Sequence, residues 1–597
     1  MFVVATAGHV DHGKSTLVRA LTGMEPDRWE EERRRGLTID LGFAWTTLPS
    51  GREVAFVDVP GHVRFLGNTL AGLGPAPVVC FVVAVDQGWQ AQSGDHRDAV
   101  AALGIRHGLV VLTRADLAPD RAGDVLTQVR AELAGTGLRD APAVTVSAAD
   151  GTGLAELREI LDRVLARVPA PATAGRLRLW VDRSFTVTGA GTVVTGTLTA
   201  GTLACGDRLQ LLGSAGRGNS RPVTVRGLQC CDKPRPSVAP VSRVALNLRG
   251  VAAHEVRRGD ALVTPGAWPE TRILDVRRGT GVPFSEAPQR LTVHVGTAAV
   301  PARLRPFDDH HARLTLDRAL PLVLGDRLVL RHPGSRRILG GAQVLDADPP
   351  PLRRRGDGAR RAEVLTGLAS DGDVLAEVAR RGAVTEQHLH RLGYDCRHVP
   401  AGVRVLSGWW VHAPAYEAWK HRLRVALQTE QRRDPLTDGL SRGAAADLIG
   451  LPDEALLDPL AGDAGLELRA GRIRLPGSGA DLGPAEPAVA ELELRLTANP
   501  FHAPEADDLA ALHLGVRELA AAERAGRLLR LTDAVVLLPS APALAMRELA
   551  GLEQPFTTSQ ARQALGTTRR VAIPLLEHLD ARGWTRRTDA GHRKVVR

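Results

Sequence analysis

The sequence Gly-His-Val-Asp-His-Gly-Lys-Ser occupies residues 8–15 and directly follows an apolar stretch, residues 2–7. It matches the phosphate-loop pattern, which binds nucleoside triphosphates between a strand and a helix. The glycines let the backbone curl around phosphate, Lys14 supplies a positive charge, and Ser15 supplies a hydroxyl for Mg²⁺. The motif predicts a nucleotide-binding α/β domain with a parallel sheet. Within this segment the predicted nucleotide contacts are Gly8, Asp11, His12, Gly13, Lys14, Ser15 and Thr16.

Three further motifs follow predicted strands, as expected for a GTPase. Asp58-Val59-Pro60-Gly61-His62 comes after residues 53–57, Thr113-Arg114-Ala115-Asp116 after residues 108–112, and Ser147-Ala148 after residues 143–146. Because parallel strands end at one edge of a sheet, the motifs are expected to line one crevice. Asp116 can accept hydrogen bonds from both N1–H and N2–H₂ of guanine, a donor pair that adenine lacks. The contacts predicted to GTP or GDP are Gly61, Thr113, Arg114, Asp116, Ser147 and Ala148.

Hydrolysis of GTP needs a Mg²⁺ ion and a positioned water molecule. We expect Ser15, Thr38 and Asp58 to hold the Mg²⁺. Thr38 lies in the polar segment Arg35-Gly36-Leu37-Thr38-Ile39, which is expected to be a switch ordered by the γ-phosphate. His62 is the predicted catalytic residue, which orients the attacking water. The sequence assigns no arginine finger, so a partner is expected to activate hydrolysis.

The segments Gly-His-Val-Asp-His-Gly-Lys, Arg-Gly-Leu-Thr-Ile and Asp-Val-Pro-Gly-His resemble those of the translational GTPases, the family of elongation factor Tu. The resemblance covers residues 1–170 and implies a ribosome-stimulated GTPase. That family usually carries Asn-Lys-x-Asp at the guanine site, whereas this chain carries Thr113-Arg114-Ala115-Asp116. The asparagine that usually braces this loop is therefore missing. We expect Asp116 to keep guanine selectivity, with the planar Arg114 guanidinium along the base.

Positive charge is concentrated at the carboxy-terminal end of the chain. The 597 residues carry a net charge of +9, and residues 541–597 hold ten Lys and Arg against five Asp and Glu. Such a segment predicts a polyanionic partner. The sequence shows no apolar stretch of membrane-spanning length, no cleavable signal pattern and no Cys-x-x-Cys pair among its five cysteines. These features predict a cytoplasmic protein with reduced cysteines and no membrane contact.

The chain is expected to be multidomain, with an α/β phosphate-loop GTPase domain, two antiparallel β-barrels and tandem winged-helix (α+β) domains. Short strands separated by glycine turns follow a Pro/Ala-rich linker at residues 168–175 and are typical of barrels. After a second linker at residues 346–356, a pattern of helix, turn, helix and β-hairpin recurs. The predicted boundaries are 1–170 for the GTPase domain, 174–264 and 265–348 for the barrels, and 357–420, 421–480, 484–540 and 541–597 for four winged helices.

The glycine-rich hairpin at residues 189–196 resembles the second domain of the elongation factor Tu family, which helps to hold the aminoacylated end of tRNA. The whole chain is similar to the selenocysteine-specific elongation factors, the SelB family. The resemblance implies a selenocysteine pocket at Asp182, Arg183 and Arg243, where a cationic site prefers selenolate to neutral serine. It also implies that the last winged helix binds an mRNA hairpin, with contacts at Arg569, Arg570, Arg586, Arg587, His592, Arg593 and Lys594.

The implied function is GTP-dependent delivery of selenocysteinyl-tRNA to the ribosome at a recoded stop codon by a monomeric factor tethered to an mRNA hairpin. Two alternatives stay open. The first is another tRNA-delivering or initiation GTPase whose tail contacts ribosomal RNA. The second is a GTP-gated regulator that binds DNA, because winged helices more often bind DNA than RNA.

Overall fold

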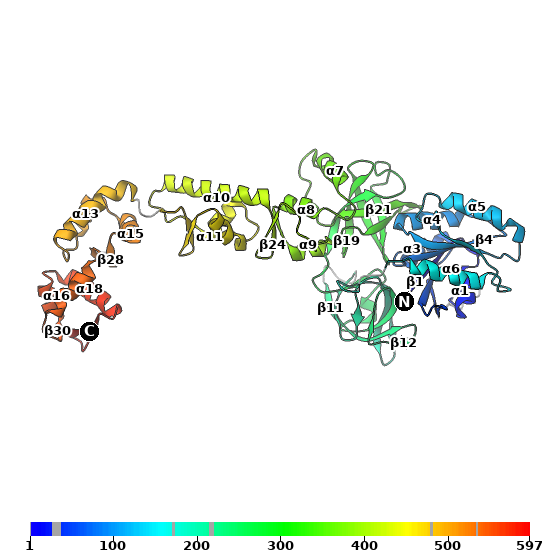
Figure 1. Ribbon diagram of the computed structural model, residues 1–597, viewed down its shortest axis with the longest axis horizontal. Coiled ribbons are helices and arrows are strands. Elements are labelled where there is room, and N and C mark those ends of the chain that lie inside the picture. Colours follow the sequence, from blue (N-terminus) through cyan, green and yellow to red (C-terminus); the bar gives the residue numbers. More distant parts are fainter. Residues whose placement is uncertain are drawn as a thin grey trace. The chain divides into compact units, whose positions relative to one another are not determined.

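Figure 1 shows the computed structural model of the chain, which describes residues 2–26, 38–169, 173–213, 220–477, 482–532 and 535–596. The chain forms two compact units. The first unit, Met1–Val374 with Glu386–His398, contains the GTPase domain and both barrels. The second unit comprises Leu375–Thr385 and Val399–Arg597. No described helix combines the length and the apolar character that crossing a lipid bilayer requires.

The GTPase domain is built on a six-stranded sheet in which only the β2–β3 pair is antiparallel. Neighbouring residues of β1 belong to different apolar clusters: Val3 packs in the cluster of Leu70 and Val129, and Val4 in the cluster of Leu17. Helices therefore cover both faces, as buried parallel strands require. In sheet order the strands are β2 (Gly42–Thr47), β3 (Glu53–Asp58), β1 (Phe2–Ala7), β4 (Val78–Ala84), β5 (His107–Thr113) and β6 (Ala143–Thr145). The helices are α1 (Lys14–Thr22), α3 (Leu66–Leu73), α4 (Ala91–Leu103), α5 (Ala122–Leu133) and α6 (Leu154–Ala166).

The first barrel is an antiparallel sheet of seven strands that the pairing of β10 with β11 closes. Buried and less buried residues alternate along its strand β14, which places every second side chain in the interior. In sheet order the strands are β10 (Arg208–Leu212), β15 (Ala261–Val263), β7 (Arg178–Val187), β8 (Gly191–Leu198), β14 (Ser242–Arg249), β11 (Arg221–Cys230) and β12 (Lys233–Pro234). The short strands β9 (Leu203–Ala204) and β13 (Ser237–Val238) pair with each other.

The second barrel is a closed sheet of six antiparallel strands. The alternation is regular along β18, where Ala298, Val300, Ala302 and Leu304 are buried and the intervening residues are exposed. Both barrels agree with the architecture that the sequence predicts. In sheet order the strands are β16 (Thr271–Arg278), β19 (His311–Leu320), β18 (Ala298–Pro306), β17 (Arg290–Val295), β20 (Arg327–Arg331) and β21 (Ile338–Asp346).

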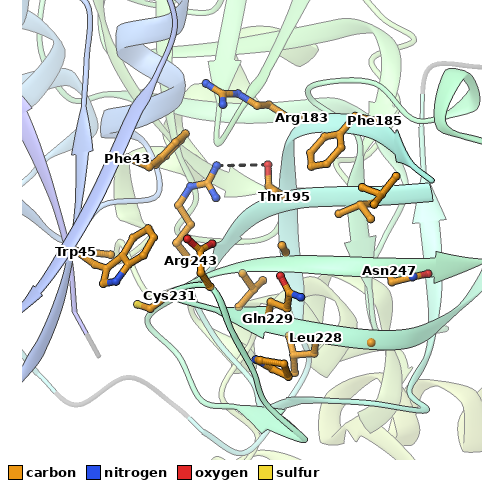
Figure 2. A pocket seen from close by; sticks show the side chains of 18 of the residues that line it. Phe43, Trp45, Arg183, Phe185, Thr195, Leu228, Gln229, Cys231, Arg243 and Asn247 are labelled. Atoms are coloured by element: carbon orange, nitrogen blue, oxygen red, sulfur yellow. Dashed lines mark hydrogen bonds between the residues drawn. The ribbon is translucent and has the colours of Figure 1, made fainter. Parts of the chain in front are cut away.

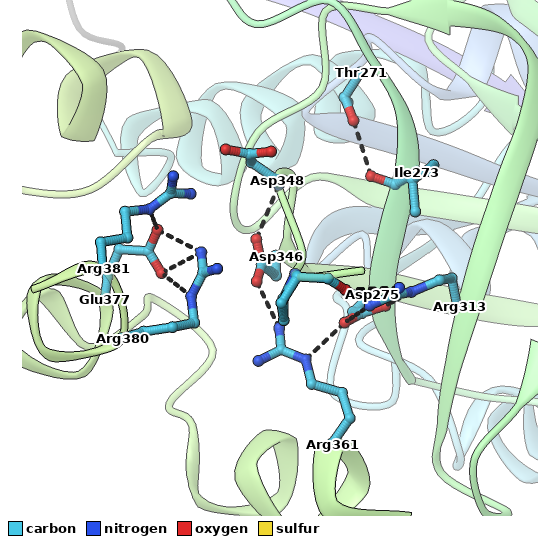
Figure 3. Close-up of polar contacts among 11 residues, drawn as sticks. Thr271, Ile273, Asp275, Arg313, Asp346, Asp348, Arg361, Glu377, Arg380 and Arg381 are labelled. Carbon is cyan, nitrogen blue, oxygen red and sulfur yellow. Dashed lines mark hydrogen bonds and ion pairs between the residues drawn. The ribbon is translucent and has the colours of Figure 1, made fainter. Parts of the chain in front are cut away.

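Helix α7 (Asp357–Gly367) is fixed to the second barrel by a buried ion-pair network (Figure 3). Arg361 on α7 pairs with Asp275 at 2.7 Å and with Asp346 at 2.5 Å. Arg313 of β19 pairs with the same Asp275 at 2.7 Å. Because removing one partner of such a network leaves a buried charge, the network holds the helix firmly. Residues 357–374, which the sequence assigns to the first winged helix, therefore belong with the barrels.

The second unit contains four small antiparallel sheets in its described residues. Their strands are β22 (Ala383–Thr385), β23 (Val403–Leu406) and β24 (Trp409–His412); β25 (Leu440–Ser441), β26 (Glu467–Arg469) and β27 (Arg472–Arg474); β28 (Leu529–Thr532) and β29 (Val535–Leu537); and β30 (Phe556–Thr557), β31 (Thr585–Arg587) and β32 (His592–Val595). The helices before and between them are α8 (Val374–Arg381), α10 (Ala413–Arg433), α11 (Arg442–Ile449), α12 (Leu457–Asp463), α13 (Glu486–Ala498), α14 (Ala506–Ala511), α15 (Val516–Arg524), α16 (Ala541–Ala550), α17 (Thr558–Ala564) and α18 (Arg569–Ala581). Helix α9 (Glu386–Leu392) is part of the first unit.

The last two winged-helix segments share one apolar core. Leu492 and Val536 from the earlier segment pack in the same cluster as Phe556, Leu575 and Leu579 from the later one. These five side chains are almost completely buried. Neither segment therefore encloses its own core, and residues 482–596 are expected to fold as one body.

Candidate functional site

The phosphate loop has the backbone that its glycines predict. Gly8 has φ +132°, and a Cβ placed on it would lie 2.1 Å from the Val82 carbonyl oxygen, so no larger residue fits. Lys14 is buried, and its Nζ donates to the carbonyls of Gly8 at 3.1 Å and His9 at 2.8 Å. The loop is thus preformed around a lysine aimed into it, which fits a bound phosphate.

The three side chains predicted to hold Mg²⁺ lie together. Ser15 Oγ donates to Asp58 Oδ2 at 2.6 Å and lies 3.1 Å from Thr38 Oγ1. Burial raises the pKa of the Asp58 carboxyl, against the opposing effects of Lys14 and the hydroxyls of Ser15 and Thr6. These hard oxygen donors fit a Mg²⁺ ion, which also favours the ionised carboxylate. Of the predicted switch, residues 35–37 lie outside the described part of the chain, and Thr38 begins the next described segment.

Helix α4 braces the loop through two side chains that the sequence analysis missed. His96 Nδ1 accepts the Gly8 N–H at 3.0 Å, and Gln92 Oε1 accepts the Val10 N–H at 3.3 Å. Burial and the charge of Lys14 lower the pKa of His96 to about 3, so the ring is neutral and can accept. Burial likewise lowers the pKa of His12 to about 4. The i, i+4 spacing that puts these two polar residues on one face of the helix is the only hint that the sequence offers.

Thr113 braces the guanine loop in place of the missing asparagine. Its hydroxyl donates to the His12 carbonyl at 2.7 Å, which ties this loop to the phosphate loop. Arg114 pairs with Asp86 at 3.2 Å and also donates to the Asp11 carbonyl. The Ala115 N–H donates to the Val146 carbonyl at 3.2 Å, which brings the second predicted guanine motif alongside.

The remaining predicted nucleotide residues occupy the same edge of the sheet. Asp116 is exposed on its loop, whereas Ser147 is buried and its Oγ accepts the Ala149 N–H at 3.3 Å. A Cβ on Gly61 would lie 2.5 Å from the Val10 backbone nitrogen, so only glycine allows this close approach. His62 is partly exposed, and its Nδ1 accepts the Arg64 N–H at 3.2 Å.

A cavity of about 420 Å³ lies between strand β2 and the first barrel (Figure 2). Asp182 is buried beside it and accepts hydrogen bonds from Thr195 Oγ1 and, at 3.1 Å, from Arg243 Nη2. Arg243 Nη2 also lies 3.3 Å from Thr195 Oγ1. The three side chains form one polar cluster, which we call the Asp182–Thr195–Arg243 cluster.

The sequence analysis places Asp182, Arg183 and Arg243 in one pocket, and the structure gives Asp182 and Arg183 different ion-pair partners. Arg183 pairs with Asp40 of the GTPase domain at 3.0 Å, and Asp182 lies at a register shift in the pairing of β7 with β8. The sequence analysis also missed the aromatic wall that Phe43 and Trp45 of β2 supply to this cavity. Two aromatic residues just after the switch, in a chain with 4% aromatic content, were the available sign.

The basic residues predicted to bind mRNA differ in exposure. Arg569 and Arg586 are exposed, and Lys594 is partly exposed. The structure contradicts the predicted mRNA contact at Arg593, because this residue is buried. It pairs with Asp580 at 2.9 Å and donates to Thr558 Oγ1 at 3.1 Å, so it stabilises the fold. The other three have acidic partners: Arg570 with Glu505 at 3.0 Å, Arg587 with Glu577 at 3.6 Å, and His592 with Asp589 at 3.0 Å.

Three family models match the chain. The elongation factor Tu GTP binding domain matches residues 1–167, and the beta-barrel domain of the selenocysteine-specific elongation factor matches residues 280–351. The winged helix of elongation factor SelB matches residues 547–593. These ranges include the phosphate loop, strands β17 to β21 of the second barrel, and helices α17 and α18 with strand β31 near the carboxy-terminal end.

The chain is 34% identical to the selenocysteine-specific elongation factor of Escherichia coli (strain K12), over 99% of this chain and 98% of that protein. It is 29% identical to that of Desulfomicrobium baculatum, over 100% of this chain and 99% of that protein. The crystal structure of the bacterial selenocysteine-specific elongation factor EF-Sec matches with a TM-score of 0.79 and 25% identity over 100% of both chains. Methanococcus maripaludis SelB in complex with the GTP analogue GppNHp shares the fold over 58% of this chain and 79% of that chain, with a TM-score of 0.50 and 22% identity. The chain therefore belongs to the selenocysteine-specific elongation factors, a family of translational GTPases.

Proposed function

We propose that the protein delivers selenocysteinyl-tRNA to the ribosome at a recoded stop codon and is held near that codon by an mRNA hairpin. The observation that carries the proposal is the Asp182–Thr195–Arg243 cluster, buried at Asp182 and Thr195, beside the cavity of about 420 Å³. The full-length relatives favour this function over an initiation factor or a DNA-binding regulator.

Selectivity follows from charge. A selenol has a lower pKa than a thiol or a hydroxyl, so selenocysteine enters the pocket as an anion at neutral pH. Arg243 offers this anion a charge-assisted hydrogen bond, and Asp182 holds the guanidinium in place at 3.0 Å. Serine brings no charge, so it can offer the same guanidinium only a neutral hydrogen bond, which is weaker than a charge-assisted one.

GTP occupies the crevice at the edge of the GTPase sheet. In this proposal Lys14 binds the β- and γ-phosphates, and Asp116 selects guanine. Ser15, Thr38 and Asp58 hold Mg²⁺, which supplies positive charge to the phosphates. His62 orients the attacking water, and hydrolysis lets the segment around Thr38 relax so that the tRNA is released.

In this proposal the carboxy-terminal β-hairpin binds the mRNA hairpin and so determines at which codon the factor acts. Arg569, Arg586 and Lys594 suit a folded RNA loop, which displays phosphates and splayed bases. Binding there raises the local concentration of the factor at one codon, so a scarce protein can compete with release factors.

The test is a binding competition between selenocysteinyl-tRNA and seryl-tRNA on the same tRNA body. The protein is loaded with a non-hydrolysable GTP analogue, and the two dissociation constants are compared. We expect a preference of about 100-fold or more for selenocysteinyl-tRNA, as for other sites built around a buried polar group. Equal affinities would reject the proposed function.

A further inference from the structure

Residues 38–43 run from the nucleotide crevice to the aminoacyl cavity along one stretch of backbone. At one end Thr38 Oγ1 lies 3.1 Å from Ser15 Oγ. At the other end the Phe43 ring lies against Arg243, whose Cζ is 3.3 Å from the ring centroid. Only four residues separate Thr38 from Phe43. Thr38 and Phe43 are therefore the two ends of one short stretch of chain, residues 38–43.

Arg183 binds the middle of this stretch from the side of the first barrel. Its Nη2 donates to the Leu41 carbonyl at 2.6 Å and pairs with the Asp40 carboxylate at 3.0 Å. Arg258, also from the first barrel, pairs with the same carboxylate at 3.3 Å. The Asp40 side chain is thus the point at which two barrel arginines contact the segment that follows the switch.

The same stretch is also held from within the GTPase domain. Asn68 of α3 donates to the Ile39 carbonyl at 2.8 Å and accepts from Arg258 at 2.9 Å. Helix α3 begins four residues after His62. Contacts from the barrel and from this helix therefore converge on residues 39–41.

The two arginines near the cavity have different partners. Arg243 contacts Asp182 and Thr195, which both belong to the barrel. The charged partner of Arg183 is in the GTPase domain. Figure 2 shows the two guanidinium groups lying apart, with that of Arg243 between Phe43 and Thr195. Both guanidinium groups lie over the Phe43 ring, that of Arg183 at 5.2 Å and that of Arg243 at 3.3 Å, but their ion-pair partners belong to different domains.

We propose that Arg183 is a positioning residue that couples the nucleotide state to the aminoacyl pocket, and that Arg243 recognises selenocysteine. The inference rests on the proposed function. While the nucleotide holds Thr38, Asp40 and Leu41 offer Arg183 a carboxylate and a carbonyl, and Phe43 covers Arg243. When Thr38 is released, these acceptors and the Phe43 wall move together. The pocket then has different contacts in the two nucleotide states, which is what coupling requires.

Two ratios separate these roles. The nucleotide ratio compares the affinity for selenocysteinyl-tRNA in the GTP-analogue and GDP forms. The amino-acid ratio compares selenocysteinyl-tRNA with seryl-tRNA in the GTP-analogue form. For Asp40→Asn, which keeps the side-chain shape, we expect the nucleotide ratio to fall about tenfold, within the usual range of coupling, and the amino-acid ratio to stay. For Arg243→Gln we expect the amino-acid ratio to fall and the nucleotide ratio to stay the same.

Glu53→Gln is the matched control. Glu53 also forms an ion pair between the GTPase domain and the first barrel, with Arg235 at 3.4 Å, but it lies on β3, away from residues 38–43. Its loss should leave both ratios unchanged. Arg183→Lys keeps the charge but loses the planar fork, so it should reproduce the effect of Asp40→Asn, and the double variant should add nothing.

Two results would overturn the coupling. One is an unchanged nucleotide ratio in both Asp40→Asn and Arg183→Lys, with nucleotide affinity intact. The other is a fall in the amino-acid ratio as large as that of Arg243→Gln. A wild-type protein without preference for selenocysteinyl-tRNA would instead overturn the proposed function, so the two failures are distinguishable.

Discussion

At the scale of single residues, His62 is the side chain on which hydrolysis is expected to depend. Its Nδ1 accepts the Arg64 N–H at the start of the short helix η1 (Val63–Phe65), so a neutral ring carries its proton on Nε2. We expect His62→Ala to keep GTP affinity and to slow ribosome-stimulated hydrolysis by about 100-fold or more. Single-turnover hydrolysis with and without ribosomes measures both effects.

The control for His62→Ala is His62→Asn. Asparagine is a good N-cap residue, so its side chain can replace the hydrogen bond to Arg64 and preserve the loop. It does not reach as far as imidazole. Equal loss of hydrolysis in both variants therefore assigns the effect to the ring, and full activity in either one removes His62 from the mechanism.

Thr113 shows how far the sequence can predict a site. The sequence motif correctly places Thr113–Asp116 at the end of a strand, because the order of motifs and strands along the chain can be read from the sequence. It does not say what braces a loop that lacks asparagine. The answer is a hydroxyl bonded to His12, 101 residues earlier in the chain. A contact of that range depends on tertiary packing and has no local pattern.

Arg183 shows a second limit. Asp182 lies at a register shift in the pairing of β7 with β8, so the strand period does not predict what each side chain contacts. Asp182 pairs with Arg243 and Arg183 pairs with Asp40, and neither partner is close to these two residues in sequence.

At the scale of elements, the carboxy-terminal β-hairpin has two unlike faces. Arg586 is opposite Lys594 across the strands, and Arg587 is opposite Arg593. Cross-strand partners share a face, and Asp580 of α18 binds Arg593 on the second face. We expect the double variant Arg586→Gln, Lys594→Gln to bind the mRNA hairpin more weakly. The slope of log affinity against log salt concentration should become shallower by ~0.7 per lost phosphate contact. Filter binding across a salt series measures the slope.

Arg547→Gln is the matched control for this double variant, because Arg547 lies outside the β-hairpin, on α16, with its side chain 74% exposed. It should leave the salt slope unchanged. Arg593→Gln should act differently: it leaves Asp580 without its buried partner, so it lowers the free energy of unfolding by about 3 kcal/mol. An unchanged slope in the Arg586 and Lys594 double variant would mean that this face does not contact RNA.

At the scale of the whole molecule, the proposed selenocysteine pocket and the proposed mRNA-binding hairpin lie in different compact units. The aminoacyl cavity is lined by the GTPase domain and the first barrel, in the first compact unit. The basic hairpin is in the second unit, in a body whose core spans residues 482–579. Each part encloses its own apolar clusters, so one can be removed without exposing the core of the other.

The apolar core that residues 482–579 share determines which truncated forms of the protein are expected to fold. A protein of residues 1–477 loses both halves of the last body, and we expect it to bind GTP and selenocysteinyl-tRNA as the full chain does. It should fail to insert selenocysteine at a hairpin-marked stop codon in a reconstituted translation assay. A protein of residues 1–540 keeps half of the core, with Leu492 and Val536 stripped of Phe556 and Leu575, so it should aggregate on size-exclusion chromatography. Hairpin-dependent insertion by residues 1–477, or a monodisperse 1–540 protein, would contradict this division of the molecule.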